Sequence, residues 1–172
     1  MPPLRITGQK VLVLPVQAAP ALPFGSDERA SDELTFALGE RDSKVTWVAP
    51  AALQRALRNA PGYASDPRAL PADPLVHHRE HVAVEPLIGE LRRFGALVDA
   101  RLVLLPRFAA WIRDPAGGGG RVRFSAAMID SRSGDVIWWG EADGDLRPQP
   151  DTQALASAAA ALAARMVAAA GS

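Results

Sequence analysis

AAMIDSRSGDVIWWGEADG, residues 126–144, is the stretch that decides the fold. Apolar residues run up to Asp130, and the polar segment that follows contains Gly134, which can adopt the positive φ of a tight turn. Strand-forming residues then resume and lead into Trp138 and Trp139. The stretch therefore predicts two antiparallel strands joined by a short turn, which is a β-hairpin.

The residues before this hairpin predict a further strand beside it. Residues 101–113 contain the apolar run LVLL and continue past Pro106 as FAAWI, which is typical of a long strand bent or bulged at the proline. The segment DPAGGGG, residues 114–120, predicts a hairpin tip. Residues 121–128 then alternate between mostly polar and apolar side chains, the period of a half-buried strand. The middle of the chain is therefore predicted to be a three-stranded antiparallel meander.

The first part of the chain predicts two more strands. Residues 10–17, KVLVLPVQ, form an apolar run without alternation, which is typical of a strand covered on both faces, and we expect this strand to be central in the sheet. Residues 45–48 predict the second strand. Between them, Ser31 is a suitable N-cap for a helix, because acidic residues follow it in the first turn.

An amphipathic helix is predicted from Pro86, immediately before the long strand. Its apolar residues fall on one helical face, and these are Leu87, Ile88, Leu91, Phe94 and Val98. Gly89 and Gly95 lie inside the pattern and should weaken the helix by about 1 kcal/mol each relative to alanine. Packing against the sheet, rather than helix propensity, is therefore expected to hold this helix.

Two further helices complete the expected α/β fold. Pro50 is well placed to open a small helix, and Asp151 or Thr152 is expected to cap an alanine-rich helix at the end of the chain. We predict a mixed sheet, with two early strands and the three-stranded meander, packed by amphipathic helices. Residues 1–172 are expected to form one domain, with a surface excursion at residues 61–84 that contains prolines and all three histidines.

The composition of the chain excludes several classes of function. The chain has 172 residues, 19 basic and 19 acidic side chains, no cysteine and a formal net charge of zero. Disulfides, thiol catalysis and cysteine-ligated metals are thereby excluded, and no long-range positive field is available for nucleic acid or anionic lipid. Residues 1–9 do not form a secretory signal, and residues 154–171 are too rich in alanine to be expected to span a membrane.

The histidines offer one weak candidate for metal chemistry. His77, Glu80 and His81 match the H-x-x-E-H pattern of zinc peptidases, in which two histidines bind zinc and the glutamate activates water. Prolines precede the motif and no apolar stripe accompanies it, so a solvated histidine cluster is favoured and no cofactor or catalytic residue is predicted. A zinc-dependent hydrolase remains an alternative. Another alternative is a small-ligand-binding module with a pocket beneath the excursion, for which Tyr63 and the histidines are the candidate polar contacts.

The charged and aromatic residues of the meander indicate ion pairs between strands and a surface for a partner. Six arginines lie in residues 101–134 and four acidic residues in residues 135–145, so cross-strand ion pairs are favoured over a nucleic-acid site. Trp138 and Trp139 are consecutive and must face opposite sides of their strand. One can join the core, whereas the other needs cover from a loop, from the excursion or from a partner, which makes the pair the candidate partner interface.

Three stretches also carry a family resemblance. The strand KVLVLPV, the helix PLIGELRRFGALVDA leading into RLVLLP, and the hairpin at 126–144 resemble the envelope lipoprotein superfamily containing the curli secretion channel CsgG and the TolB amino-terminal domain. The resemblance covers residues 10–48 and 85–167. It implies a periplasmic or outer-membrane-associated domain that binds proteins or assembles into rings without catalysis. The chain departs from the family in lacking a lipobox cysteine and the long alternating segments of pore-forming members.

Together these observations predict a non-enzymatic accessory domain of the cell envelope, in a secretion or envelope-maintenance system. Its expected partners are an envelope protein or further copies of the chain, without nucleic acid and without a membrane span. A lipid anchor would require a cysteine upstream of this sequence. A cytoplasmic location is left open.

Overall fold

The computed structural model describes residues 3–70 and 82–171, which form one mixed five-stranded sheet and four α-helices. The strands are β1 (Lys10–Val13), β2 (Thr46–Val48), β3 (Leu102–Arg113), β4 (Gly120–Asp130) and β5 (Val136–Asp143). The helices are α1 (Ser26–Arg41), α2 (Pro50–Asn59), α3 (Leu87–Val98) and α4 (Thr152–Ala170), with a short 3-10 helix at Pro67–Ala69. This architecture confirms the predicted α/β class.

The sheet has the order β2-β1-β3-β4-β5, with a parallel half and an antiparallel half. β1 pairs in parallel with both β2 and β3, whereas β3, β4 and β5 form the predicted antiparallel meander. The expectation that β1 is central is wrong, because only β2 lies outside it and three strands follow on its other side. β3 holds the centre instead and joins the two halves of the sheet.

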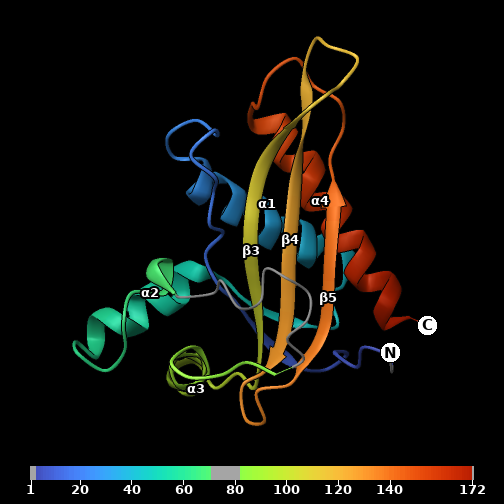
Figure 1. Cartoon of the computed structure of the whole chain (residues 1–172). Coiled ribbons are helices and arrows are strands. Elements are labelled where there is room, and N and C mark those ends of the chain that lie inside the picture. The colour runs from blue at the N-terminus through green and yellow to red at the C-terminus, as the bar shows by residue number, and fades with distance from the viewer. Residues whose placement is uncertain (1–2, 71–81, 172) are drawn as a thin grey trace.

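Helices cover the two faces of the sheet unequally (Figure 1). α1 and α4 pack on one face, over a core that includes Val11, Leu104 and Phe124. α2 and α3 lie on the other face, over a second core that includes Leu12 and Val103. Neighbouring residues of β1 therefore belong to different cores, which confirms that this strand is covered on both faces and explains why its sequence does not alternate.

The first helix begins earlier than its sequence suggests. α1 starts at Ser26, after Gly25 in a left-handed conformation with φ of 81°, so Ser31 is not the N-cap. Ser31 lies within the helix, where its hydroxyl donates to the carbonyl of Asp27 at 2.7 Å and accepts from the amide of Val16 at 2.9 Å. The hydroxyl thus satisfies a buried amide beyond β1, a tertiary role that competes with capping.

The local signals in the meander and in the last helix are confirmed. β3 has a register shift between Pro106 and Phe108, and Gly134 in the β4–β5 turn has φ of 85°. Asp151 caps α4 by accepting a hydrogen bond from the amide of Ala154 at 2.8 Å. By length and composition alone α4 would suffice to cross a membrane, and in this fold its alanine and leucine face packs against the sheet and α1.

The ends of the predicted excursion are held by the fold. Leu70 and Ala83 are buried against the core beneath α2 and α3, and Val82 forms a bridge with Asp135 before β5. Residues 71–81 lie outside the described part of the chain, so the conformation of the excursion as a whole stays a prediction.

Candidate partner interface

The meander extends beyond the parallel half of the sheet and presents one face that we call the distal sheet face. β3 pairs with β4 as far as Arg113, whereas its parallel pairing with β1 ends at Leu104 apart from an isolated bridge at Ala109. The distal sheet face consists of Phe108, Ala110 and Ile112 from β3, Arg121, Arg123 and Ser125 from β4, and Trp139, Glu141 and Asp143 from β5.

Strand register arranges these side chains in three stripes. Phe108 is opposite Ser125, which is opposite Glu141, and the next row places Ala110, Arg123 and Asp143 side by side. Because side chains on one face recur at every second residue, β3 contributes an apolar stripe, β4 a largely basic stripe and β5 an acidic stripe with Trp139 at its start.

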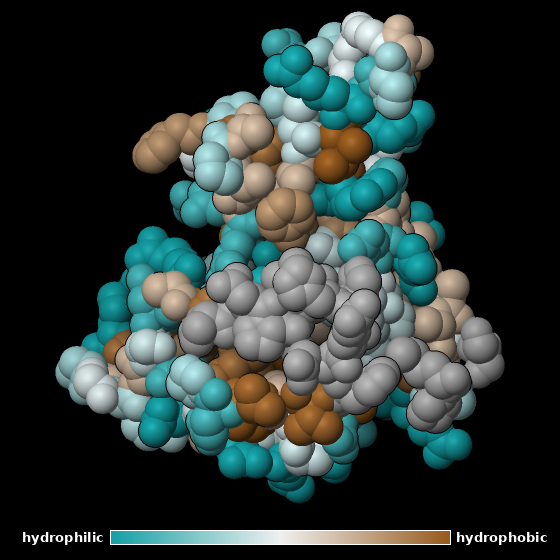
Figure 2. Space-filling model, viewed as in Figure 1, coloured by the Kyte–Doolittle hydropathy of each residue, from teal (hydrophilic) through white to brown (hydrophobic). Residues whose placement is uncertain are grey.

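No helix of the described residues covers the distal sheet face. In Figure 1, α2 and α3 lie beside the lower half of the sheet, and the upper part of β3 and β4 projects beyond them. Phe108 is 44% exposed and Ile112 is 39% exposed, whereas Val122 and Phe124 on the opposite face are buried with α4. Apolar side chains are therefore exposed on one face of a well-anchored sheet extension, and Figure 2 shows brown and teal surface close together there.

A bidentate ion pair joins β4 and β5 on this face. The Arg123 guanidinium donates to the Asp143 carboxylate at 2.6 and 2.9 Å, and it lowers the pKa of Asp143 from its ordinary value. This contact confirms the predicted use of meander arginines in cross-strand pairs. Because both side chains are about two-fifths exposed, we expect the pair to add little to the free energy of unfolding. Its main effect is to hold the two side chains in a fixed orientation.

The two tryptophans do face opposite sides of β5, as predicted. Trp138 is 4% exposed and belongs to the core beneath α1 and α4. Trp139 is half-buried and packs at the margin of the second core, at the base of the distal sheet face. Trp138 therefore has almost no surface to offer a partner in this conformation, and the partner-interface role of Trp139 stays a prediction.

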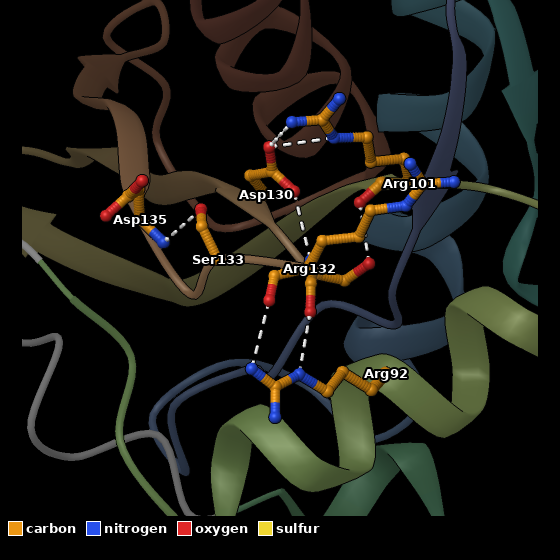
Figure 3. Close-up of polar contacts among 7 residues, drawn as sticks. Arg92, Arg101, Asp130, Arg132, Ser133 and Asp135 are labelled. Atoms are coloured by element: carbon orange, nitrogen blue, oxygen red, sulfur yellow. Dashed lines mark hydrogen bonds and ion pairs between the residues drawn. The ribbon is translucent and has the colours of Figure 1, made fainter.

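A polar network closes the opposite end of the hairpin (Figure 3). Arg101 donates to Oδ2 of Asp130 through Nε at 2.8 Å and through a terminal nitrogen at 2.5 Å. Arg92 on α3 donates to the carbonyls of Ser131 and Arg132 at 3.2 and 3.0 Å. The turn that the DSRSG segment predicted is thus bound both to the start of β3 and to α3. A hollow of about 650 Å³ adjoins it, but Arg101 and Asp130 on its wall are paired with each other.

This network predicts a pH-dependent contribution to stability. The Arg101 hydrogen bonds, helped by the amide of Arg132, lower the pKa of Asp130 below its ordinary value. A carboxyl group with a lowered folded-state pKa stabilises the fold above its unfolded pKa of about 3.9 and loses that contribution as pH falls through the folded value. Asp130→Asn should therefore reduce the free energy of unfolding by about 1–2 kcal/mol at pH 7, with a shrinking difference from wild type below pH 4.

Urea unfolding of both proteins between pH 7 and pH 3 measures this difference. Asp143→Asn is the matched control, because its carboxylate is more exposed than that of Asp130 and its ion pair should contribute less. An Asp130→Asn difference that stays constant down to pH 3 would assign its effect to packing instead of charge.

The predicted metal candidates fall outside the described region. His77, Glu80 and His81 all lie within residues 71–81, so the zinc alternative stays untested. Within residues 3–70 and 82–171, no group of three or more histidine, aspartate or glutamate side chains is arranged to hold a metal ion. Tyr63, the remaining candidate for a small ligand, is described and is 45% exposed.

Sequence reasoning did not single out the apolar stripe of the distal sheet face. Phe108 and Ile112 belong to the run FAAWI, whose composition predicts a strand but does not indicate which of its residues face solvent. The bulge after Pro106 shifts the alternation by one residue, and it is this shift that turns Phe108 and Ile112 to the same face as Ser125 and Arg123.

Comparisons with known proteins bear on the fold. No protein-family model and no curated protein matches the sequence. The structure is similar to the LpoB C-terminal domain from Escherichia coli, with a TM-score of 0.51 and 16% identity over 81% of this chain and 84% of that one. It is also similar to a PelC variant dodecamer from Paraburkholderia phytofirmans, with a TM-score of 0.53 and 16% identity over 98% of this chain and 94% of that one.

At this level of identity the likenesses concern the fold alone. They show that this chain shares the α/β fold of these two proteins, as the sequence resemblance led us to expect of the fold class. They do not single out the curli secretion channel or the TolB amino-terminal domain, so those finer names are not confirmed.

Proposed function

We propose that this chain is a non-enzymatic accessory domain of the cell envelope that binds a protein partner through the distal sheet face. The observation that carries the proposal is the exposure of Phe108 and Ile112 on β3, beside the ion pair of Arg123 and Asp143 on β4 and β5. Apolar side chains at the centre of a patch with a polar rim are the usual composition of a protein-binding surface.

The geometry favours a protein partner over a small substrate. The stripe lies along the face of a sheet, whereas small-molecule sites are concave and bury most of their ligand. Arg123 and Asp143 are held by each other, so they form a fixed polar border that would give register to a partner. Phe108 and Ile112 would supply the buried apolar contacts at the centre of such an interface.

The finer parts of the proposal concern location and assembly. We place the protein in the periplasm or at the outer membrane, with a role in secretion or envelope maintenance, and treat residues 1–172 as one domain. Its expected partners are an envelope protein or further copies of the chain. The second is supported by the fold relative PelC, which is described as a dodecamer.

Site-specific photo-crosslinking tests the interface in intact cells. A photo-reactive amino acid is introduced at Phe108 or at Ile112, and, as a control, at the exposed Glu40 of α1 on the opposite helical layer. We expect one discrete crosslinked product from both sheet positions and none from the control. Its mass and peptide identity distinguish an envelope protein from a second copy of the chain.

The proposal fails if the two sheet positions give no product, or give the same set of products as Glu40. A crosslinked cytoplasmic protein would leave the binding face in place and overturn the envelope assignment.

A further inference from the structure

A charged groove lies on a different part of the molecule. It has a volume of about 1250 Å³ and runs between the β1–α1 loop and α2, at the carboxyl ends of β1 and β2. In Figure 2 the outline of the molecule is indented on the left between these two segments. Ligands of open α/β sheets characteristically bind outside the carboxyl ends of the parallel strands.

The two walls of the charged groove carry opposite charges in equal number. Asp27, Glu28 and Asp32 line it from α1, and Arg55, Arg58 and Arg68 line it from the side of α2. Among the described residues no ion pair joins the walls, and Arg68 instead pairs with Asp66 at 3.1 Å. Asp27, Glu28 and Asp32 therefore lie on one side of the groove and Arg55 and Arg58 on the other, without an ion pair between them.

The floor and rim of the charged groove are apolar. Val16 and Leu22 are buried beneath it, Pro20 and Pro23 border it, and Phe24 at its rim is fully exposed. Exposure of an aromatic ring to water is unfavourable. The ring offers a flat surface on which an aliphatic or cationic side chain can pack.

We infer that the charged groove binds an extended peptide segment that carries both basic and acidic side chains. Basic side chains would face α1 and acidic ones α2, while apolar side chains would contact Phe24. The groove exceeds the 300–1000 Å³ or so of a typical small-molecule site, which suits a chain better than a compact ligand. Nucleic acid and other polyanions are disfavoured by the acidic wall. This inference stands apart from the distal sheet face and does not rest on the proposed function.

Reversing the charges on each wall of the groove tests this inference. Full-length protein labelled with ¹⁵N is titrated with three synthetic peptides of equal length and apolar content. In the mixed peptide basic and acidic residues alternate, so that in an extended chain they face opposite walls, and the other two peptides are entirely basic and entirely acidic. We expect the mixed peptide to bind the wild-type protein best. Its chemical-shift changes should centre on Ala18, Gln54 and Phe24, and high salt should weaken it.

The variants change which peptide is preferred. Arg55→Glu with Arg58→Glu makes both walls acidic, so binding of the mixed peptide should weaken about tenfold and the basic peptide should become the better ligand. Asp27→Lys with Glu28→Lys should favour the acidic peptide in the same way. Reversal of both walls together should restore binding of the mixed peptide, because an extended peptide can lie in either direction.

The restoring variant separates charge recognition from damage to the fold. Unchanged affinities in the single-wall variants, shift changes centred on the distal sheet face, or no binding at millimolar peptide would each overturn the inference. Equal wall-dependent binding of free arginine or free glutamate would overturn the assignment to a peptide.

Discussion

Trp138→Ala is expected to lower the free energy of unfolding by about 3–5 kcal/mol, the usual cost of deleting a buried large aromatic side chain. The indole lies opposite Met128 on β4 and is 4% exposed. It also fills the space beside Gly140, where an added Cβ would come within 2.6 Å of the ring. The cavity left by alanine cannot easily close, because α4 is held against the sheet by contacts on either side. Urea unfolding followed by circular dichroism measures the loss.

Trp139→Ala is the matched control, one residue away on the same strand. Its side chain is half-buried on the other face, so we expect a loss well below that of Trp138→Ala and an intact fold. If Trp139 contributes to the proposed interface, this variant should weaken crosslinking at Phe108 while the protein stays folded. Equal losses of stability in the two variants would contradict the assignment of Trp138 to the core and Trp139 to its margin.

The strands were predictable where local sequence and tertiary environment agree. The unbroken apolar run of β1, the proline of β3 and the DSRSG turn each carry a local physical signal, and each is found where the sequence placed it. The start of α1 was not predictable from Ser31, because its hydroxyl satisfies the amide of Val16, a partner 15 residues away in sequence.

The candidate sites depend more on long-range arrangement. Opposed tryptophans and cross-strand arginine pairs follow from strand alternation, so the sequence could anticipate them. Which tryptophan is buried depends on the register shift between Met128 and Ile129 of β4 and on the packing of α4, and neither is a local property. The charged groove combines α1, α2 and the 3-10 helix, whose side chains are far apart in sequence, so no single motif marks it.

Gly95→Ala is expected to destabilise the protein by about 1–3 kcal/mol, although helix propensity alone predicts a gain of about 1 kcal/mol. A Cβ at this position would lie 2.5 Å from the carbonyl oxygen of Ala100 and 3.3 Å from Oγ of Ser131. The carbonyl belongs to the backbone that joins α3 to β3, and Ser131 hydrogen-bonds to Arg101 at the start of that strand. The helix could accept the methyl group only by moving away from the hairpin turn. Urea unfolding measures the sign of the change.

Gly89→Ala provides the opposite case within the same helix. Here the added Cβ would meet Oε2 of Glu85 at 2.7 Å, which is the free end of an exposed and flexible side chain. The carboxylate can rotate away, which costs the 3.2 Å hydrogen bond that it accepts from the amide of Gly89. The higher helix propensity of alanine should therefore decide the change in the free energy of unfolding. We expect this variant to be neutral or up to about 1 kcal/mol more stable than wild type. A stabilising effect of alanine at both positions would mean that α3 does not approach the β3 connection as closely as the structure has it.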